Sequence, residues 1–454
     1  MKKILIYGFL WGMFSVTSWG QFNMVAYDFT GSATVLQTNP GADYKYKKLF
    51  GIPFLSNIQT FAGSTGFSMY DLLAPEGTFE EKVYATVADL KNKDFVLVNY
   101  RQDLFTVGWT DDMQRFKYLG MYWELDHITY TPADIIQLGL DGNAPHMNQR
   151  YEADHIASKT ELVQTMYYGV HKNPNPFLNI GYRFKLYTGI ANAQTVSNKG
   201  ALYNTPGENN FYVHHLDNVD INLQSSGYNE DKENVGYYVS KFLFSGNYGP
   251  GFDFGVTYQY TDKMSFSAAL LDLGFIYYTT DLHNYQVKGS YQYEGVAIQF
   301  PENYMDYWQE VKDQFNEEIT AEENSRSYIS FRPTSLYASL KYGMGDLRHQ
   351  DCENFMNPKK EYTSFLGLTT FAQMRPVKIH LGLSAFYEQK WSKHFYTKMN
   401  ITADNFSYTS LGAGLVWNIG RLQLLVTADN LVGLSDLAKS RKQSLQFGLN
   451  IIKF

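Results

Sequence analysis

The sequence predicts an all-β protein, a transmembrane antiparallel β-barrel of about 14 strands, and three features indicate it. Apolar and polar residues alternate over runs of about ten residues, long enough to cross a bilayer when tilted. Aromatic residues make up 17% of the chain, as expected for strands that end in interfacial girdles. After the N-terminal segment no run of about 18 apolar residues occurs, which excludes a helical membrane protein. A secreted, Tyr-rich β-sandwich is the competing interpretation.

The clearest hairpin spans residues 249–278. Every second residue of its first strand is apolar, from Phe252 onward, and polar residues lie between them. After a short turn the alternation resumes in a second strand. Near Leu270 and Leu271 the phase reverses, which predicts a β-bulge that turns Asp272 to the opposite face. Residues 209–224 are interpreted as a further strand, and residues 286–300 are expected to continue the barrel.

The N-terminus carries the marks of a secretory signal peptide over residues 1–20. Two lysines precede an apolar run and small residues, so cleavage is expected before Gln21. The residue directly after the cleavage site is Gln21 and not Cys, which argues against a lipid anchor. Residues 21–77 are then an N-terminal segment, either plug-like at the barrel mouth or a first strand, and residues 78–454 are the barrel. The expected location is the cell outer membrane.

Short helices are expected in the loops. Thr78 and Glu81 have the spacing of a capping box, and apolar residues follow at helical intervals. Residues 131–143 predict another short helix. A third helix, acidic and amphipathic, is expected over residues 301–323. It either covers an end of the barrel or docks a partner, and the docking candidates are Tyr304, Trp308 and Phe315.

Charge, cysteine content and motifs exclude several classes of function. A net charge of -7 gives no basic field for nucleic acid. Cys352, the one cysteine, leaves no partner for an internal disulfide. No nucleophile elbow, zinc-protease motif or phosphate loop occurs. His214 and His215 point to opposite faces of one strand, which disfavours a metal site. The sequence therefore predicts no enzyme, cofactor or metal.

Charged residues on the polar sides of the strands are the candidate lumen set. These are Arg183, Lys185, Asp253, Lys341, Lys378, His380, Glu388, Arg421 and Asp429. They either form a path or site for a polar or anionic solute or fill a narrow barrel as paired charges. Mixed signs favour the paired network, because opposite charges in a confined interior need partners.

Several segments carry a resemblance to known barrels: the exported N-terminus, the Asn39-Pro40-Gly41 opening, the hairpin GFDFGVTYQYTDKMSFSAALLDLGFI and the closing LQLLVTADNLVG and LQFGLNIIKF. The chain resembles a large family of Bacteroidota outer-membrane barrels of unknown function. More distantly it is similar to FadL-type and PorV-type barrels. The likeness to FadL-type barrels implies uptake of hydrophobic molecules, and the likeness to PorV-type barrels implies a role in type IX protein secretion. No individual site residue carries over.

Two functions follow as expectations. The first is FadL-like transport of a small hydrophobic molecule through an aromatic-lined lumen or lateral opening. The alternative is a non-transporting barrel that docks a partner such as a secretion-system component. An integral-membrane hydrolase is a third hypothesis. Outer-membrane lipid is an expected partner, and the terminal Phe454 predicts contact with the barrel-insertion machinery during biogenesis.

Overall fold

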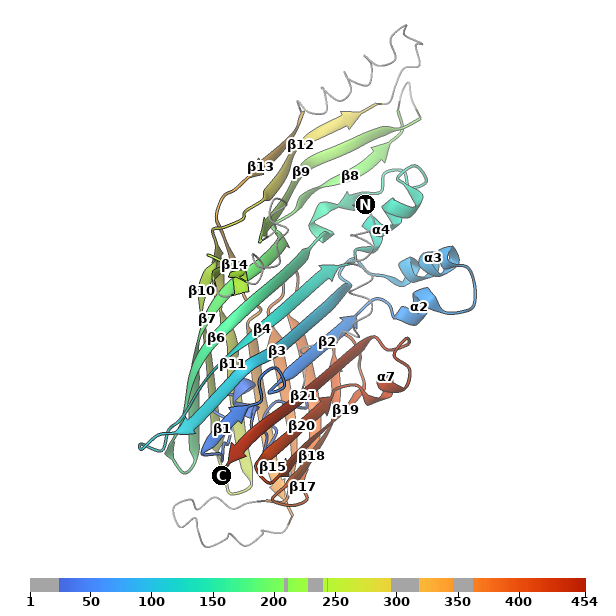
Figure 1. The fold of residues 1–454 in the computed structure, drawn as a ribbon. Helices are drawn as coiled ribbons and strands as arrows, with labels where there is room; N and C mark the ends of the chain where they lie inside the picture. Colours follow the sequence, from blue (N-terminus) through green and yellow to red (C-terminus); the bar gives the residue numbers. More distant parts are fainter. Residues whose placement is uncertain (1–23, 208–210, 228–239, 243, 295–317, 346–361) are drawn as a thin grey trace.

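The chain forms a closed antiparallel β-barrel of 14 strands, as predicted (Figure 1). This computed structural model describes residues 24–207, 211–227, 240–242, 244–294, 318–345 and 362–454. Two positions in the wall are each occupied by two short strands. β1 and β2 both pair with β3 and β21, and β14 and β15 both pair with β11.

The wall strands follow one another around the barrel in chain order. They are β1 (Lys48–Gly51) with β2 (Ile58–Ser64), β3 (Phe95–Thr110), β4 (Phe116–Tyr130), β6 (Ser158–Asn175), β7 (Leu178–Thr195), β10 (Tyr248–Gln259), β11 (Met264–Tyr278), β14 (Tyr328–Phe331) with β15 (Ser335–Met344), β16 (Ser364–Gln373), β17 (His380–Lys390), β18 (Phe395–Asp404), β19 (Ser410–Ile419), β20 (Leu422–Ala428) and β21 (Lys442–Lys453).

The barrel closes between its first and last strands. Lys48 of β1 pairs with Lys453 of β21, and Ile58 of β2 pairs with Phe447. Between β1 and β2, residues 52–57 leave the sheet and return to it. Because the last strand pairs with the first, the wall has no free edge along this seam.

Alternation places apolar side chains outside and polar ones inside. In β10, Phe254 is 41% exposed, whereas Asp253 is fully buried. β7 and β17 follow the same pattern, with Phe184 and Leu383 facing outward and Arg183 buried. An apolar outer face is suited to contact with lipid. The polar groups of the inner face can be buried without water where they have hydrogen-bond partners within the protein.

The predicted bulge in the β10–β11 hairpin is confirmed. Leu271 and Asp272 together lie opposite the single residue Asp253. Asp272 has a φ of +57°, and its Oδ1 accepts a hydrogen bond from Nζ of Lys185 at 2.6 Å. The bulge therefore turns this carboxylate into the lumen. Leu271 is buried, so the phase reverses one residue later than predicted.

The two ends of the barrel differ. At one end most connections are short turns, such as residues 111–115 and 420–421, and the chain ends beside them. The connections at the other end are mostly long, which is the extracellular end in outer-membrane barrels. In the turn between β3 and β4, Nε of Arg115 donates to Oδ2 of Asp111 at 2.9 Å, and this bond lowers the pKa of the Asp111 carboxyl.

A second group of strands projects beyond the wall at the long-loop end (Figure 1). It contains β5 (Tyr151–Glu152), β8 (Lys199–Thr205), β9 (Val213–Ser226), β12 (Asn284–Tyr293) and β13 (Ile319–Asn324). The strand predicted over residues 209–224 is confirmed by β9. The prediction that residues 286–300 continue the wall was wrong for their described part, because β12 lies in the projecting group. β9 and β12 pair with each other and rise above the wall strands. Residues 295–300 lie outside the described residues.

The helices are short and lie in connections or in the lumen. They include η1 (Val35–Gln37), α2 (Met69–Leu73), α3 (Phe79–Asp89), α4 (Ala133–Asp141), η2 (Ala153–His155) and α7 (Leu431–Ser435). The capping box before α3 is confirmed, because the Thr78 side chain accepts from the Glu81 N–H and the Glu81 carboxylate accepts from the Thr78 N–H. Among the described residues, no helix is long and apolar enough to span a membrane.

The helix predicted over residues 301–323 was wrong in its last part. Residues Ile319–Asn324 form β13, whose backbone pairs with β12 from Gly289 to Asn284. Hydrogen bonds to a neighbouring strand therefore override the helical spacing of the apolar residues there. The remainder, including the docking candidates Tyr304, Trp308 and Phe315, lies outside the described residues.

The outward face of the wall can be tested by substitution. Leu368 lies in the middle of β16 and is 49% exposed. We expect Leu368→Arg to lower the free energy of unfolding by roughly 2–4 kcal/mol, because the outer face meets hydrocarbon near the bilayer midplane. Urea unfolding in lipid vesicles measures the change. The control is Met113→Arg in the β3–β4 turn, and an equal cost there would contradict the lipid-facing assignment.

Candidate functional site

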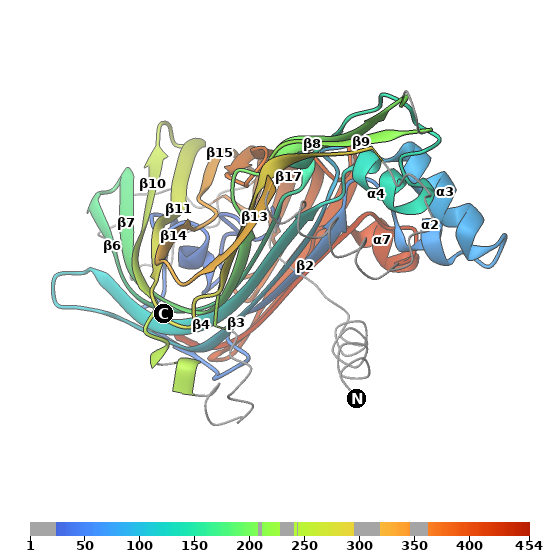
Figure 2. The same cartoon turned by 90° about the horizontal axis from the view of Figure 1, so that it is seen from above.

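The lumen is filled by the N-terminal segment, residues 24–47, which we call the plug. Its side chains are almost all buried, and Tyr27, Phe29 and Asn39 are fully so. Figure 2 shows this segment inside the ring of strands. Met24 packs near the long-loop end against Phe95, and Tyr46 packs near the other end against Phe454. The plug therefore runs most of the length of the barrel.

Cations of the wall bind backbone carbonyls of the plug. Nζ of Lys398 donates to the carbonyl oxygen of Tyr27 at 2.7 Å. Nη2 of Arg183 donates to the carbonyl oxygen of Gln37 at 3.1 Å. The plug has little regular secondary structure of its own, so these bonds satisfy acceptors that would otherwise be buried without a partner.

Carboxylates of the wall bind backbone N–H groups of the plug. The Val25 N–H donates to Oδ1 of Asp429 at 3.1 Å, and the Thr30 N–H donates to Oε1 of Glu388 at 3.0 Å. Both acceptors belong to the predicted lumen set. Their role in the structure is to hold the plug, together with the cations above.

The turn Asn39-Pro40-Gly41 lies directly against the wall. A Cβ atom on Gly181 of β7 would approach the Pro40 carbonyl oxygen to 1.8 Å. A Cβ on Gly255 of β10 would lie 2.2 Å from Oδ1 of Asn39. Only glycine lets the plug backbone come this close to the two strands.

A first cluster of paired charges joins β7, β10 and β11. Nε of Arg183 lies 2.5 Å from Oδ2 of Asp253. Nζ of Lys185 lies 2.9 Å from Oδ1 of Asp253 and 2.6 Å from Oδ1 of Asp272. Two cations thus face two carboxylates, which is the paired network that the mixed signs of the sequence favoured.

A second cluster crosses the lumen from the break between β14 and β15. Nη1 of Arg332 lies 2.8 Å from Oε2 of Glu161 on β6, and Nη2 lies 2.8 Å from Oε2 of Glu124 on β4. Lys159 of β6 also contacts Glu161, at 3.3 Å. Arg332 therefore connects the end of β14 to β4 and β6, two wall strands with which β14 does not pair.

A cavity of about 1060 Å³ lies in the wall beside this break. β15 pairs with β11 on one side and β16 on the other. Within the described part of the chain, β14 pairs only with β11. Residues 332–334 and 374–376 border the gap that results and line the cavity.

The cavity lining combines both faces of the wall. Leu273, Phe331 and Met374 are exposed apolar residues at its outer side, and Phe331 is 71% exposed. Arg332 and Arg375 line it as well and are buried. An apolar entrance on the membrane side therefore meets a polar floor in the barrel interior.

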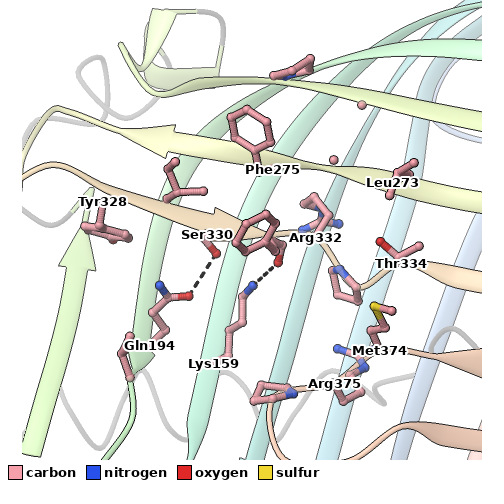
Figure 3. Close-up of a pocket in the computed structure, with 18 of the residues that line it drawn as sticks. Lys159, Gln194, Leu273, Phe275, Tyr328, Ser330, Arg332, Thr334, Met374 and Arg375 are labelled. Carbon is pink, nitrogen blue, oxygen red and sulfur yellow. Dashed lines mark hydrogen bonds between the residues drawn. The ribbon is translucent and has the colours of Figure 1, made fainter.

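The floor of the cavity is fixed by hydrogen bonds (Figure 3). Nζ of Lys159 donates to the Phe331 carbonyl oxygen at 2.5 Å, and Oγ of Ser330 donates to Oε1 of Gln194 at 3.0 Å. Nη1 of Arg375 lies 2.5 Å from Oδ2 of Asp126. Each cation of the floor already has a protein partner, so the cavity offers no uncompensated positive charge.

The predicted lumen residues separate into two groups. Arg183, Lys185, Asp253, Lys341, Glu388, His380 and Asp429 are buried inside the barrel. Lys378 lies instead in the connection between β16 and β17, where Nζ donates to the Lys93 carbonyl oxygen at 3.1 Å. Arg421 is exposed in the turn between β19 and β20, because the strand ends before it.

Several interior charges escaped the sequence analysis. These are Asp28, Arg101, Asp103, Glu124, Asp126, Lys159, Glu161, Arg332, Arg375, Lys398, Asp404 and Lys442. Those on wall strands alternate with outward residues, so the same rule of period two identifies Arg101 and Glu124 once the strand is assigned. Arg332 gives no such signal, because it lies between two short strands.

No group of three potential metal-ligating side chains occurs in the part of the chain that the structure describes. His214 makes a hydrogen bond with Asn143, at 2.8 Å from Nδ1, and His215 with Thr205, at 2.9 Å from Nε2. Cys352 lies outside the described residues.

The closed wall, the apolar outer face and the plugged interior define an outer-membrane β-barrel. The chain belongs to the family of unknown function DUF5723, whose model matches residues 40–429. The resemblance to barrels of unknown function is thus confirmed at family level, whereas the bacterial group and the likeness to PorV-type barrels stay predictions. No curated protein matches this chain.

Solved structures with a similar arrangement have little sequence in common with it. The Ralstonia pickettii toluene transporter TbuX is 8% identical with a TM-score of 0.44, and the match covers 96% of this chain and 100% of that one. A Pseudomonas aeruginosa FadL homologue is 9% identical with a TM-score of 0.44, over 96% of this chain and 99% of that one.

The paired charges of the first cluster can be tested with Asp253→Asn. Arg183 would then lose its carboxylate and Lys185 would keep only Asp272, so we expect a loss of about 3–5 kcal/mol in the free energy of unfolding. Asp112→Asn in the exposed β3–β4 turn is the control and should cost less than about 0.5 kcal/mol. Equal stability of the two variants would contradict a structural role for the cluster.

The close contact of plug and wall can be tested with Gly181→Ala. The added methyl group collides with the Pro40 backbone, so we expect the plug to be displaced and the variant to conduct ions in planar bilayers above the wild-type level. Gly139→Ala in α4, where a Cβ meets nothing within 4 Å, is the control. Unchanged conductance in both variants would show that this contact does not hold the lumen shut.

Proposed function

We propose that the protein transports a small hydrophobic molecule across the outer membrane through the cavity in its wall. The observation that carries the proposal is the break between β14 and β15, beside which β14 does not pair with β16. It places a cavity of about 1060 Å³ between an apolar outer entrance and the barrel interior. Leu273, Phe331 and Met374 form that entrance, on the face that meets lipid.

The filled lumen supports passage through the wall over passage along the barrel axis. The plug occupies the interior from Met24 to Tyr46, and wall charges bind its backbone. A water-filled pore for polar solutes therefore has no room along the axis. A hydrophobic molecule, by contrast, dissolves in the lipid beside the barrel and reaches the wall from there.

The size and polarity of the cavity suit a ligand of a few hundred daltons. Ligand pockets are commonly about 300–1,000 Å³ in volume and mostly apolar, with a few placed polar groups. Ser330, Gln194 and Thr334 supply such groups among the lining residues. Since the floor cations are already paired with Glu161, Glu124 and Asp126, charge is not required of the ligand.

Docking of a partner is the second candidate function. The filled lumen and the sheet of β8, β9, β12 and β13 favour it, because that sheet projects past the long-loop end and offers a large surface to another protein (Figure 1). In this alternative the barrel would act as a component of a type IX secretion system, as PorV-type barrels do. In that case the wall cavity would have no transported ligand.

Met374→Trp tests the transport proposal. Met374 is exposed at the cavity entrance, and the larger indole narrows it without removing a polar partner. We expect the initial rate of uptake of radiolabelled naphthalene to fall about fivefold or more in cells whose only copy is this variant, at equal amounts of barrel in the membrane.

The matched control is Val377→Trp, in the same connection but outside the cavity lining. Its uptake rate should stay within about twofold of the wild type. Equal uptake by wild-type cells and by cells without the gene would overturn transport of this class of molecule. Co-purification of a stoichiometric protein partner from such membranes would then favour docking.

A further inference from the structure

Two connections at the long-loop end form one structural unit. The first, between β2 and β3, contains α2 and α3; the second, between β20 and β21, contains α7. The Tyr70 N–H donates to the Ala438 carbonyl oxygen at 2.7 Å. Nζ of Lys439 lies 4.6 Å from the centre of the Tyr70 ring. The connections are held together because their strands, β2 and β21, pair in the wall.

This unit exposes many large apolar side chains. We call the following residues the lateral patch: Met69, Leu73, Phe79, Leu431, Val432 and Leu437. Leu73 is 64% exposed, Phe79 65% and Val432 62%. A cluster of exposed apolar side chains on a connection between strands indicates a surface that contacts a membrane or another molecule.

The patch continues the lipid-facing surface of the wall. On β19, Leu411 and Trp417 face outward and are exposed, and on β20 Leu424 and Val426 face outward. α7 begins three residues after β20 ends, so only Asp429 and Asn430 separate Leu431 from the end of the strand.

The helices of the unit also extend sideways from the barrel. Figures 1 and 2 both show α2, α3 and α7 beyond the outline of the wall on one side, and not above the mouth. At that position they extend outward beside β2, β20 and β21. A helix that lies there meets lipid headgroups before it meets another soluble molecule.

We propose that the lateral patch inserts into the outer leaflet at the boundary between headgroups and acyl chains. Amphipathic elements bury their apolar side about 5–10 Å deep at this boundary. Charges of both signs border the patch, including Lys82, Lys439 and Glu80, so no single sign of headgroup is selected. The patch fixes the tilt and depth of the barrel on the side of its seam. This inference does not depend on the transport proposal.

Fluorescence quenching by lipid tests the inference. Cys352→Ser gives a background without cysteine, into which Leu73→Cys and Val432→Cys are introduced singly and labelled with a nitrobenzoxadiazole dye. The full-length barrel is placed in phosphatidylcholine vesicles that contain phosphatidylcholine with a nitroxide at carbon 5. We expect quenching at both sites of at least about half that measured at Leu368→Cys on the lipid-facing wall.

Phe211→Cys supplies the negative control, because Phe211 is 91% exposed beside the projecting sheet and belongs neither to the wall nor to the patch. Heat-modifiable migration on gels confirms that each variant is folded. Quenching at Leu73 and Val432 no greater than at Phe211 overturns the proposal. A second copy of the chain would cover the patch instead if two results occur together. The two dyes would become less accessible to aqueous iodide as the protein concentration rises, and the nitroxide lipid would not quench them.

Discussion

The structure depends on one requirement, which is that the backbone of a segment without regular secondary structure must find hydrogen-bond partners inside a barrel. The plug is buried, so its N–H and C=O groups cannot rely on bulk water. Wall side chains supply the partners: Lys398 and Arg183 bind carbonyls, and Asp429 and Glu388 bind N–H groups. These four interior charges therefore hold the plug.

The same requirement explains the pairing of charges around the plug. A buried charged side chain that donates to or accepts from the plug backbone still needs an opposite charge nearby. The reason is that removing an unpaired ion from water is costly. Asp253 provides this for Arg183 and Lys185. Arg332 is likewise paired with Glu161, and both the arginine and the break in the wall lie beside the cavity.

Local patterns in the sequence predicted the parts of the structure that local physics determines. The alternation in β7, β10 and β17, the capping box before α3 and the bulge at Asp272 follow from backbone geometry within a few residues. Wall strands and projecting strands are both extended segments, so the pattern did not separate β12 from the wall. The pairs that build the site join residues as far apart as Arg332 and Glu161, and no spacing in the sequence indicates them.

The position of the plug has a consequence for how the barrel is made. The plug leads directly into β1, and β1 pairs with β21 at the seam, so the first and last parts of the chain meet only when nearly all strands exist. Such distant contacts form late because a long loop must close first. A plug still outside when the seam closes must thread a finished cylinder lined with charge. Biogenesis is therefore simplest when the strands assemble around the plug, which then acts as the template for the interior.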